Sequence, residues 1–255
     1  MEVLGHVYTV IHGSASRMDL LSSNQVDLVL TSPPYFCKEI EARLSLPRKD
    51  QKNENMVFRE IYSFATALRP CFEEIYRVLK PGRAFVIQTK DIRYGNILIP
   101  LSDHHLSIAM SCGFNLITRF NWVPFQSSFK RMPGILTKKK VGQFRVSTGE
   151  TFLILAKGLS LDCRGSLDPA NINISSLISP LWRTPFRRKK DDHPHVSPRP
   201  VIKNIISLLS HEGDLVVDPF AGYGTIIEVS RSLKRLAIGW EIDQECVNEA
   251  LKRLR

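Results

Sequence analysis

Apolar residues occur along this chain in two patterns, short continuous runs and longer stretches with helical spacing. Continuous runs indicate buried strands, and apolar residues that recur every three or four positions indicate amphipathic helices. The expected strands span residues 7–11, 26–30, 84–87, 114–122, 150–155, 215–217 and 236–240. The expected helices span residues 16–22, 58–79, 97–112, 198–209, 225–233 and 243–254. This alternation predicts an α/β protein with a doubly wound, mostly parallel sheet and helices on both faces.

Proline and glycine mark where several of these elements end. Pro70 is expected to break the helix over 58–79, and Lys80-Pro81-Gly82 is expected to end it. Gly113 is expected to cap the next helix. Three weakly periodic segments are expected to be variable loops or small recognition elements within one domain spanning 1–255; they are residues 36–58, 123–148 and 158–192.

The composition is that of an ordinary globular protein, with 43% hydrophobic and 24% charged residues in a chain of 255. No apolar stretch approaches the ~20 residues that span a membrane. The N-terminus also lacks the basic start and apolar run of a secretory signal. The five cysteines form no Cys-x-x-Cys pair and are expected to be reduced thiols. These features predict a cytoplasmic location and no metal site.

The formal net charge is +10, which favours a polyanionic partner through long-range attraction and counterion release. The basic residues group in three segments: Arg43, Arg48, Lys49 and Lys52; Lys130, Arg131, Lys138, Lys139, Lys140 and Arg145; Arg183, Arg187, Arg188, Lys189 and Lys190. The alternative for each segment is an ordinary solvated surface.

Two motifs follow expected strands. Thr31-Ser32-Pro33-Pro34-Tyr35 offers polar atoms, stiff prolines and an aromatic ring, which suit a flat nucleobase. Taken alone, it could equally be an ordinary turn. Asp218-Pro219-Phe220-Ala221-Gly222-Tyr223-Gly224-Thr225 is rich in glycine and suits a cofactor that contains a nucleoside. A dinucleotide fingerprint is the alternative, but it requires a third glycine that the sequence does not have after Thr225. Loops at the carboxyl ends of neighbouring strands form the ligand crevice of such sheets, so the pair predicts group transfer to a base.

Together, these motifs resemble the DNA amino-methyltransferases, in the permuted β class that places the target-base motif first. The resemblance includes Lys80-Pro81-Gly82, Gly113-Phe114, His193-Pro194 with Pro198, and Gly239-Trp240-Glu241-Ile242-Asp243. It implies a seven-stranded Rossmann-like methyltransferase sheet with circularly permuted motif order. The strand at 7–11 would then lie beside the strand at 236–240, and both motif loops would follow adjacent central strands. Closely placed chain ends are the usual condition for permutation.

The resemblance also implies the catalytic roles. Ser32 Oγ and the Pro33 carbonyl would accept the hydrogens of an exocyclic amine, beside Pro34, while Tyr35 would stack on the base. Positioning an activated methyl donor is then the main catalytic contribution. Turning the target nucleotide out of the duplex is implied as well, and increased fluorescence of 2-aminopurine at the target would report it. Serine at the first position is typical of enzymes that modify cytosine N4, although some such enzymes modify adenine N6.

The implied cofactor is S-adenosylmethionine. The residues expected to bind it are Asp218, Pro219, Phe220, Ala221, Gly222, Gly224, Thr225, Glu241, His193 and Pro194. Glu241 would accept hydrogen bonds from the ribose hydroxyls, whereas Asp243 better suits a helix N-terminus. His193 and His195 could also suggest a metal, but no further ligand lies nearby. Many relatives have Gly-Asp where this chain has Gly13-Ser14, which puts the contact to the cofactor's adenine in doubt.

The expected partner is double-stranded DNA, with a companion restriction nuclease as a further candidate. The residues expected to contact DNA are Lys130, Arg131, Lys138, Lys139, Lys140, Arg183, Arg187 and Arg188. Two rivals stay open: a methyltransferase that acts on RNA or protein, and a DNA-binding subunit that retains the fold without catalysis.

Overall fold

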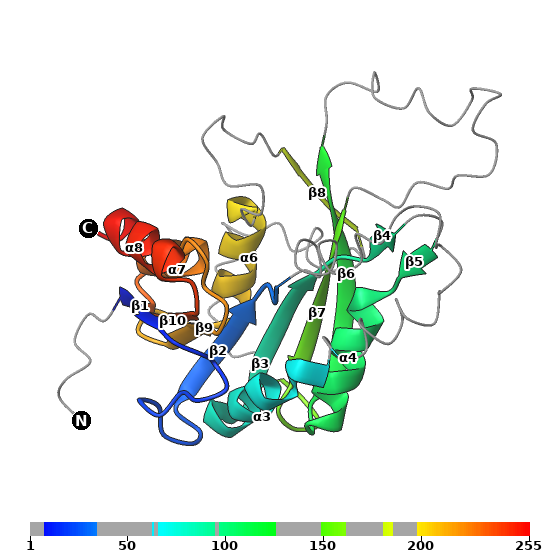
Figure 1. Cartoon of the computed structure of the whole chain (residues 1–255), viewed down its shortest axis with the longest axis horizontal. Helices are drawn as coiled ribbons and strands as arrows, with labels where there is room; N and C mark the ends of the chain where they lie inside the picture. The colour runs from blue at the N-terminus through cyan, green and yellow to red at the C-terminus, as the bar shows by residue number, and fades with distance from the viewer. Residues whose placement is uncertain are drawn as a thin grey trace, which may run out of the picture.

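The computed structural model describes residues 8–34, 63, 66–94, 97–125, 149–161, 181–185 and 198–255, and its main feature is one large sheet (Figure 1). The strands are β1 (Tyr8–His12), β2 (Val26–Thr31), β3 (Leu79–Thr89), β6 (Asn115–Phe125), β7 (Glu150–Ala156), β8 (Leu181–Pro185), β9 (Leu215–Asp218) and β10 (Leu236–Glu241). Their spatial order is β1-β10-β9-β2-β3-β7-β6-β8. Two short strands, β4 (Ile92–Tyr94) and β5 (Ile97–Ile99), form a separate antiparallel pair.

The predicted fold class is confirmed. Strands β1, β10, β9, β2 and β3 run parallel, and only β7 runs antiparallel to its two neighbours. The first seven strands of the spatial order correspond to the seven that the sequence predicts. Strand β8 adds an eighth at the edge, within the segment 158–192 that was expected to hold loops or small elements.

Helices cover both faces of the sheet, as the alternating pattern predicts (Figure 1). They are α3 (Arg69–Val78), α4 (Leu101–Ser111), α6 (Arg199–Leu209), α7 (Thr225–Ser232) and α8 (Gln244–Arg253). Helices α3 and α4 share one hydrophobic cluster with the sheet, and α6, α7 and α8 share the other. Strands β2 and β9 are buried along their whole length because both faces are covered, which explains their continuous apolar sequences.

Pro70 and Gly113 mark element boundaries where the sequence predicts them. Helix α3 begins at Arg69 with Pro70 in its first turn, after a turn at Leu68, so the predicted break is confirmed. Gly113 follows α4 with φ +102°, a conformation that glycine adopts easily, and its N–H bonds to the Met110 carbonyl.

One expected helix and two expected boundaries are wrong. Residues 16–22 form turns rather than a helix, because the Met18 N–H donates to the Glu74 carboxylate at 2.9 Å instead of joining a helical ladder. Strand β3 already begins at Leu79, so Lys80-Pro81-Gly82 lies within the strand and does not precede it. Residues 97–99 pair with β4 as β5, and the helix that follows begins only at Leu101.

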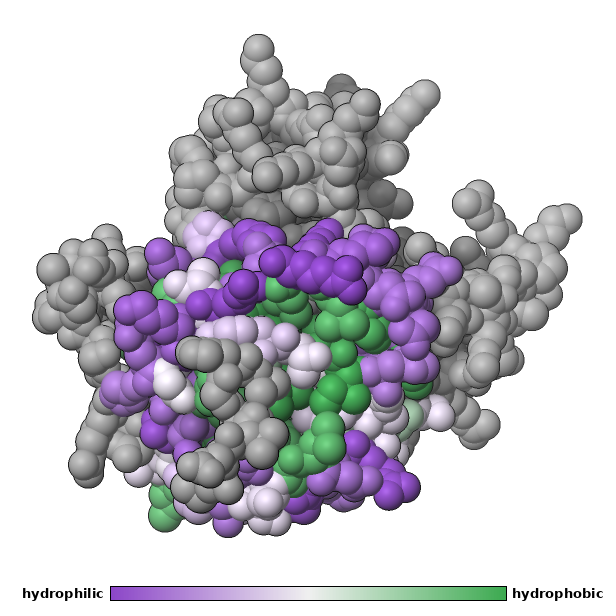
Figure 2. Space-filling view, turned by 90° about the vertical axis from the view of Figure 1, so that its left-hand side faces the viewer, coloured by the Kyte–Doolittle hydropathy of each residue, from purple (hydrophilic) through white to green (hydrophobic). Residues whose placement is uncertain are grey.

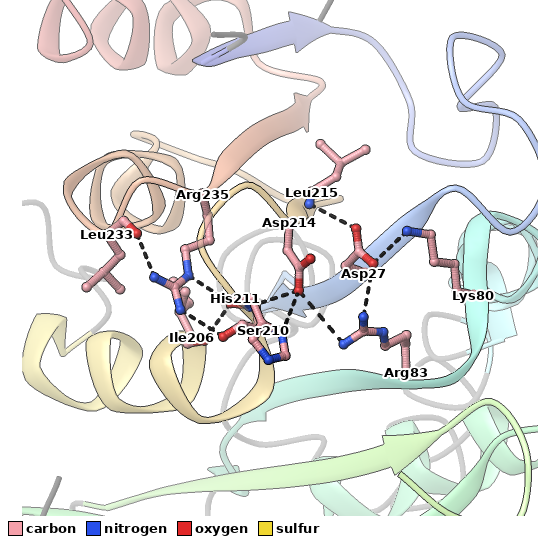
Figure 3. Close-up of polar contacts among 10 residues, drawn as sticks. All are labelled: Asp27, Lys80, Arg83, Ile206, Ser210, His211, Asp214, Leu215, Leu233 and Arg235. Atoms are coloured by element: carbon pink, nitrogen blue, oxygen red, sulfur yellow. Dashed lines mark hydrogen bonds and ion pairs between the residues drawn. The ribbon is translucent and has the colours of Figure 1, made fainter. Parts of the chain in front are cut away.

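Charged residues join the amino ends of the central strands (Figure 3). Asp27, at the start of β2, accepts a hydrogen bond from Lys80 Nζ at 2.6 Å and one from the Leu215 N–H at 3.1 Å. Arg83 lies between Asp27 and Asp214, at 3.5 and 3.8 Å. This group, called here the Asp27 network, ties β2, β3 and β9 together at the end of the sheet opposite the two motif loops.

Figure 2 views the molecule from the side on which Figure 1 draws β1 and α8, and shows hydrophobic surface bordered by hydrophilic residues. Strand β1 is the outermost described strand on that side, and Tyr8 and Ile11 within it are only partly buried. Of the helices in the described parts of the chain, none has the length and apolarity needed to cross a membrane.

Candidate active site

The two motifs lie side by side at the carboxyl ends of two central strands. Strand β2, which ends at Thr31, pairs directly with β9, which ends at Asp218, and both run in the same direction. Thr31 Oγ1 donates a hydrogen bond to Asp218 Oδ1 at 2.6 Å, between residues 187 positions apart in sequence. The prediction that both motif loops follow adjacent central strands is therefore confirmed. Beyond Thr31, Ser32 is half-buried, Pro33 buried and Pro34 exposed.

Asp218 has a buried carboxyl group with an unusual affinity for its proton. Burial raises its pKa to about 7, although hydrogen bonds from Thr31 Oγ1 and from the Phe220 N–H lower it. The negative charge of Glu241 also raises the pKa. A cation placed beside these two acids would relieve both the desolvation and the repulsion.

The glycine loop fits closely against β10 and α8. Gly224 has φ +74° where α7 begins, and a Cβ there would lie 3.1 Å from the Ala250 Cβ. A Cβ on Gly239 of β10 would lie only 2.6 Å from the Ala221 Cβ, so any side chain would push the loop away from the strand. Ala221 donates its N–H to the Trp240 carbonyl at 2.8 Å. These contacts hold the loop beside the carboxyl end of β10.

Glu241 holds the glycine loop at that end. Its Oε2 accepts from the Gly222 N–H at 2.8 Å, and its Oε1 accepts from the Asp243 N–H at 2.9 Å. Each carboxylate oxygen has a second lone pair, and the side chain is half-buried, so Glu241 can still accept from a ligand hydroxyl. Asp243 caps α8 by accepting from the Glu245 and Cys246 N–H groups, as the sequence predicts.

Gly13-Ser14 lies next to Glu241. The Gly13 N–H donates to the Glu241 carbonyl at 2.9 Å, and Ser14 Oγ lies 2.9 Å from Ser16 Oγ. Sequence reasoning missed Ile242, whose side chain is 73% exposed beside this turn. Its position was the available signal, because an isoleucine just past a buried strand and just before a helix cap has no core to enter.

Several predicted site residues lie outside the described residues. They are Tyr35, His193, Pro194, Lys130, Arg131, Lys138, Lys139, Lys140, Arg187 and Arg188. The backbone of Arg183 is described, as part of edge strand β8. The predicted cofactor residues lie in β9, in β10, in the loop that leads into α7 and at the first position of α7; they are Asp218, Pro219, Phe220, Ala221, Gly222, Gly224, Thr225 and Glu241.

Helices α6 and α7 are joined where both begin. Arg199, the first residue of α6, donates from its two terminal nitrogens to the two oxygens of Glu228, at 2.7 and 2.6 Å. Glu228 lies in the first turn of α7, just after the glycine loop. The pair therefore fixes the start of α6 against the first turn of α7, beside the glycine loop. In sequence, α6 follows the segment from His193 to Pro198.

The chemistry of this edge suits a cationic nucleoside cofactor. Asp218 and Glu241 bring two carboxyl groups to the ends of neighbouring strands. Such a pair would attract a ligand that carries positive charge. The fold and the loop pair thus define an α/β enzyme that transfers a group from a cationic nucleoside cofactor.

Comparisons with known proteins agree with this class. A family model described as DNA methylase, for the N6 and N4 enzymes, matches residues 26–252. The chain therefore belongs to the N6/N4 DNA methylase family.

Two curated relatives are similar along most of their length. The type II methyltransferase M.MjaI of Methanocaldococcus jannaschii is 28% identical, over 93% of this chain and 88% of that protein. The DNA adenine methyltransferase YhdJ of Escherichia coli K12 is 26% identical, over 96% and 82%.

Solved structures share the fold. The cytosine-N4-specific PvuII DNA methyltransferase has a TM-score of 0.72 at 20% identity, covering 96% of this chain and 86% of that one. TTHA0409 of Thermus thermophilus, in complex with S-adenosyl-L-methionine, has a TM-score of 0.70 at 22% identity, over 97% and 94%.

Proposed function

We propose that this DNA methylase transfers a methyl group from S-adenosylmethionine to N4 of cytosine in a short specific sequence of duplex DNA. The observation that carries the proposal is the hydrogen bond between Thr31 and Asp218. It brings the start of the base motif and the start of the cofactor motif to one point at the carboxyl ends of β2 and β9.

The described residues fit this cofactor. When bound, S-adenosylmethionine supplies a methyl group already activated on a sulfonium, and it also carries an ammonium group. Asp218 would face the cationic amino-acid part, and Glu241 would accept from the ribose hydroxyls. The loop from Pro219 to Thr225 would surround the nucleoside, with exposed Ile242 providing an apolar surface for the adenine. That surface compensates for Ser14, which lacks the carboxylate of many relatives.

The base motif would prepare the target amine. Its lone pair is delocalised into the ring, and acceptors on its hydrogens draw the nitrogen toward tetrahedral geometry. Ser32 Oγ and the Pro33 carbonyl are the proposed acceptors, because both lie just past the end of β2. Transfer would break the carbon–sulfur bond and form the carbon–nitrogen bond, leaving the cofactor as a neutral thioether, and the amine would release one proton to solvent. Holding donor and amine in line is the main catalytic contribution.

The choice of cytosine N4 rests on Ser32 at the first position of the motif. Adenine N6 is the alternative, since YhdJ, an adenine enzyme by name, is similar over most of its length. Duplex DNA of varied sequence, treated with the protein and S-adenosylmethionine, should contain N4-methylcytosine when its nucleosides are analysed by mass spectrometry. N6-methyladenine alone would overturn the choice of base.

The same assay addresses the two rivals. Methylation of RNA but not of duplex DNA would favour the first rival, a methyltransferase that acts on RNA or protein. DNA binding without any methyl transfer, and without cofactor binding by calorimetry, would favour a non-catalytic subunit. A nuclease that cuts the same sequence only when it is unmethylated is the further partner expected on this proposal. Cutting assays on methylated and unmethylated substrates test for it.

The basic segments are the proposed DNA contacts, chiefly Lys138-Lys139-Lys140 and Arg187-Arg188. Contacts to phosphate release counterions, so replacing the three lysines with alanine should weaken binding to duplexes of any sequence. The slope of log affinity against log salt should flatten by about 0.9 for each phosphate that the variant no longer neutralises. An unchanged slope would show that these lysines are solvated surface.

A further inference from the structure

Gln88 of β3 lies at the level of the base motif on the neighbouring strand. Strands β2 and β3 are parallel, with Thr31 opposite Ile87, so Gln88 is one register step further, at the level of Ser32. Its side chain is 2% exposed. Alternation along β3 places Gln88 on the same face as Val86, in the cluster that includes Leu30.

The Gln88 amide is held in one orientation by Glu150. Its Nε2 donates to Glu150 Oε2, at the start of antiparallel β7. The carbonyl oxygen Oε1 is buried, and in the described part of the chain no group donates a hydrogen bond to it. Buried acceptors normally have a hydrogen-bond partner. We therefore expect Gln88 Oε1, at the level of the base motif, to accept from a donor once the target base is bound.

A serine in the base motif creates a need for such an acceptor. A carboxylate only accepts, whereas a hydroxyl carries its own hydrogen, which must be donated elsewhere if Oγ is to accept from the amine. If the Ser32 hydrogen pointed at the amine, the two donors would face one another. An acceptor to one side of Ser32 would take the hydroxyl hydrogen and leave the lone pairs of Ser32 Oγ facing the base.

We propose that Gln88 is a positioning residue that accepts the Ser32 hydroxyl hydrogen through Oε1 when the target base is bound. This inference rests on the proposed role of Ser32. Glu150 holds the Gln88 amide, Gln88 orients Ser32, and Ser32 accepts from the amine; no proton is transferred along the chain of hydrogen bonds. Each bond polarises the next, which makes Oγ a stronger acceptor.

A double-mutant cycle tests the proposal, with single-turnover methyl transfer measured at saturating DNA and S-adenosylmethionine. Gln88→Met keeps the length of the side chain and removes both polar atoms. It should lower the transfer rate by about 10- to 100-fold, the range for loss of one strong hydrogen bond. In the Ser32→Ala background the same substitution should have no further effect. Cofactor affinity by calorimetry should stay unchanged throughout.

Thr89→Val is the matched control. Thr89 follows Gln88 on β3 but bonds to His105 on the opposite side of the strand, at 2.9 Å. This variant should lower thermal stability and leave the transfer rate unchanged. Gln88→Glu should work while it shares one proton with Glu150, because the shared proton holds the new side chain in place and leaves an oxygen to accept from Ser32. Loss of that proton leaves two carboxylates that repel one another, so the transfer rate relative to the unmodified chain should fall as pH rises.

The outcomes separate the two claims. An equal loss of rate from Gln88→Met with Ser32 and with Ala at position 32 would overturn the role of Gln88 alone, as would no loss with Ser32. An unchanged rate in Ser32→Ala itself would overturn the proposed role of Ser32, and the role of Gln88 with it.

Discussion

At the scale of single residues, Asp218 links the stability of the site to pH. Its folded pKa of about 7 lies above the ordinary value of 3.8, so the folded chain holds a proton that the unfolded chain releases. Its contribution to stability is therefore greatest below pH 3.8 and is lost as pH rises to about 7. The shift from 3.8 to about 7 corresponds to a loss on the order of 4 kcal/mol.

Asp218→Asn should remove this dependence, since the amide oxygen can still accept from Thr31 and from the Phe220 N–H. The Tm difference between Asp218→Asn and the unmodified chain should grow in favour of the variant from about pH 4 to about pH 7 and then level off. Calorimetric melting across this range measures it. A difference that does not change with pH would show that Asp218 is ionised in the folded chain.

The sequence predicts the position of single site residues best where chemistry and chain position coincide, while their roles stay predictions. Asp218 and Glu241 are the last residues of β9 and β10, and Ser32 follows the end of β2, so a parallel sheet brings the three to the same end of the sheet. Gln88 carries no such signal, because its importance depends on the register between β3 and its neighbours β2 and β7. Contacts of that kind are set by folding over long sequence separations, which local patterns do not encode.

At the scale of elements, the Asp27 network holds the starts of β2, β3 and β9 together (Figure 3). Asp27→Ala would leave the buried Leu215 N–H without its acceptor and Arg83 without one of its two carboxylates. Unfolding in urea should show a loss of about 2–4 kcal/mol. Cofactor affinity should be retained, because the network lies at the end of the strands opposite the site.

Asp19→Ala is the matched control for Asp27. Asp19 pairs with Arg17 at 2.9 Å, but both side chains are largely exposed, so the loss should stay below about 0.5 kcal/mol. Equal losses from the two substitutions would contradict a structural role for the Asp27 network.

Most elements could be predicted, because strong apolar periodicity and proline or glycine boundaries agree with the tertiary structure. The failures have a common cause. Met18 donates to Glu74, 56 positions along the chain, and Ile97 to Ile99 pair with the nearby β4, so in both places a hydrogen-bond partner outside the helix overrides helical spacing. Pro81 and Gly82 read as a helix stop, yet the chain continues directly as β3.

At the scale of the whole molecule, the permuted order of motifs agrees with the sheet. Strand β1 pairs with β10 in parallel, and α8 packs beside them, so the first and last described elements are neighbours (Figure 1). The chain break can therefore lie elsewhere in the fold without separating the two motif loops. Strand β8 could not be foreseen, because residues 158–192 lack clear periodicity and β8 is defined only by its pairing with β6.

The central claim is that the ends of β2 and β9 form one site for cofactor and base. A crystal structure of the chain with S-adenosylmethionine and a short duplex tests it most directly. The account predicts the cofactor against Asp218, Gly222 and Glu241, with its methyl group facing Ser32 and the Pro33 carbonyl. A cofactor bound elsewhere, or a methyl group that points away from Ser32, would contradict it.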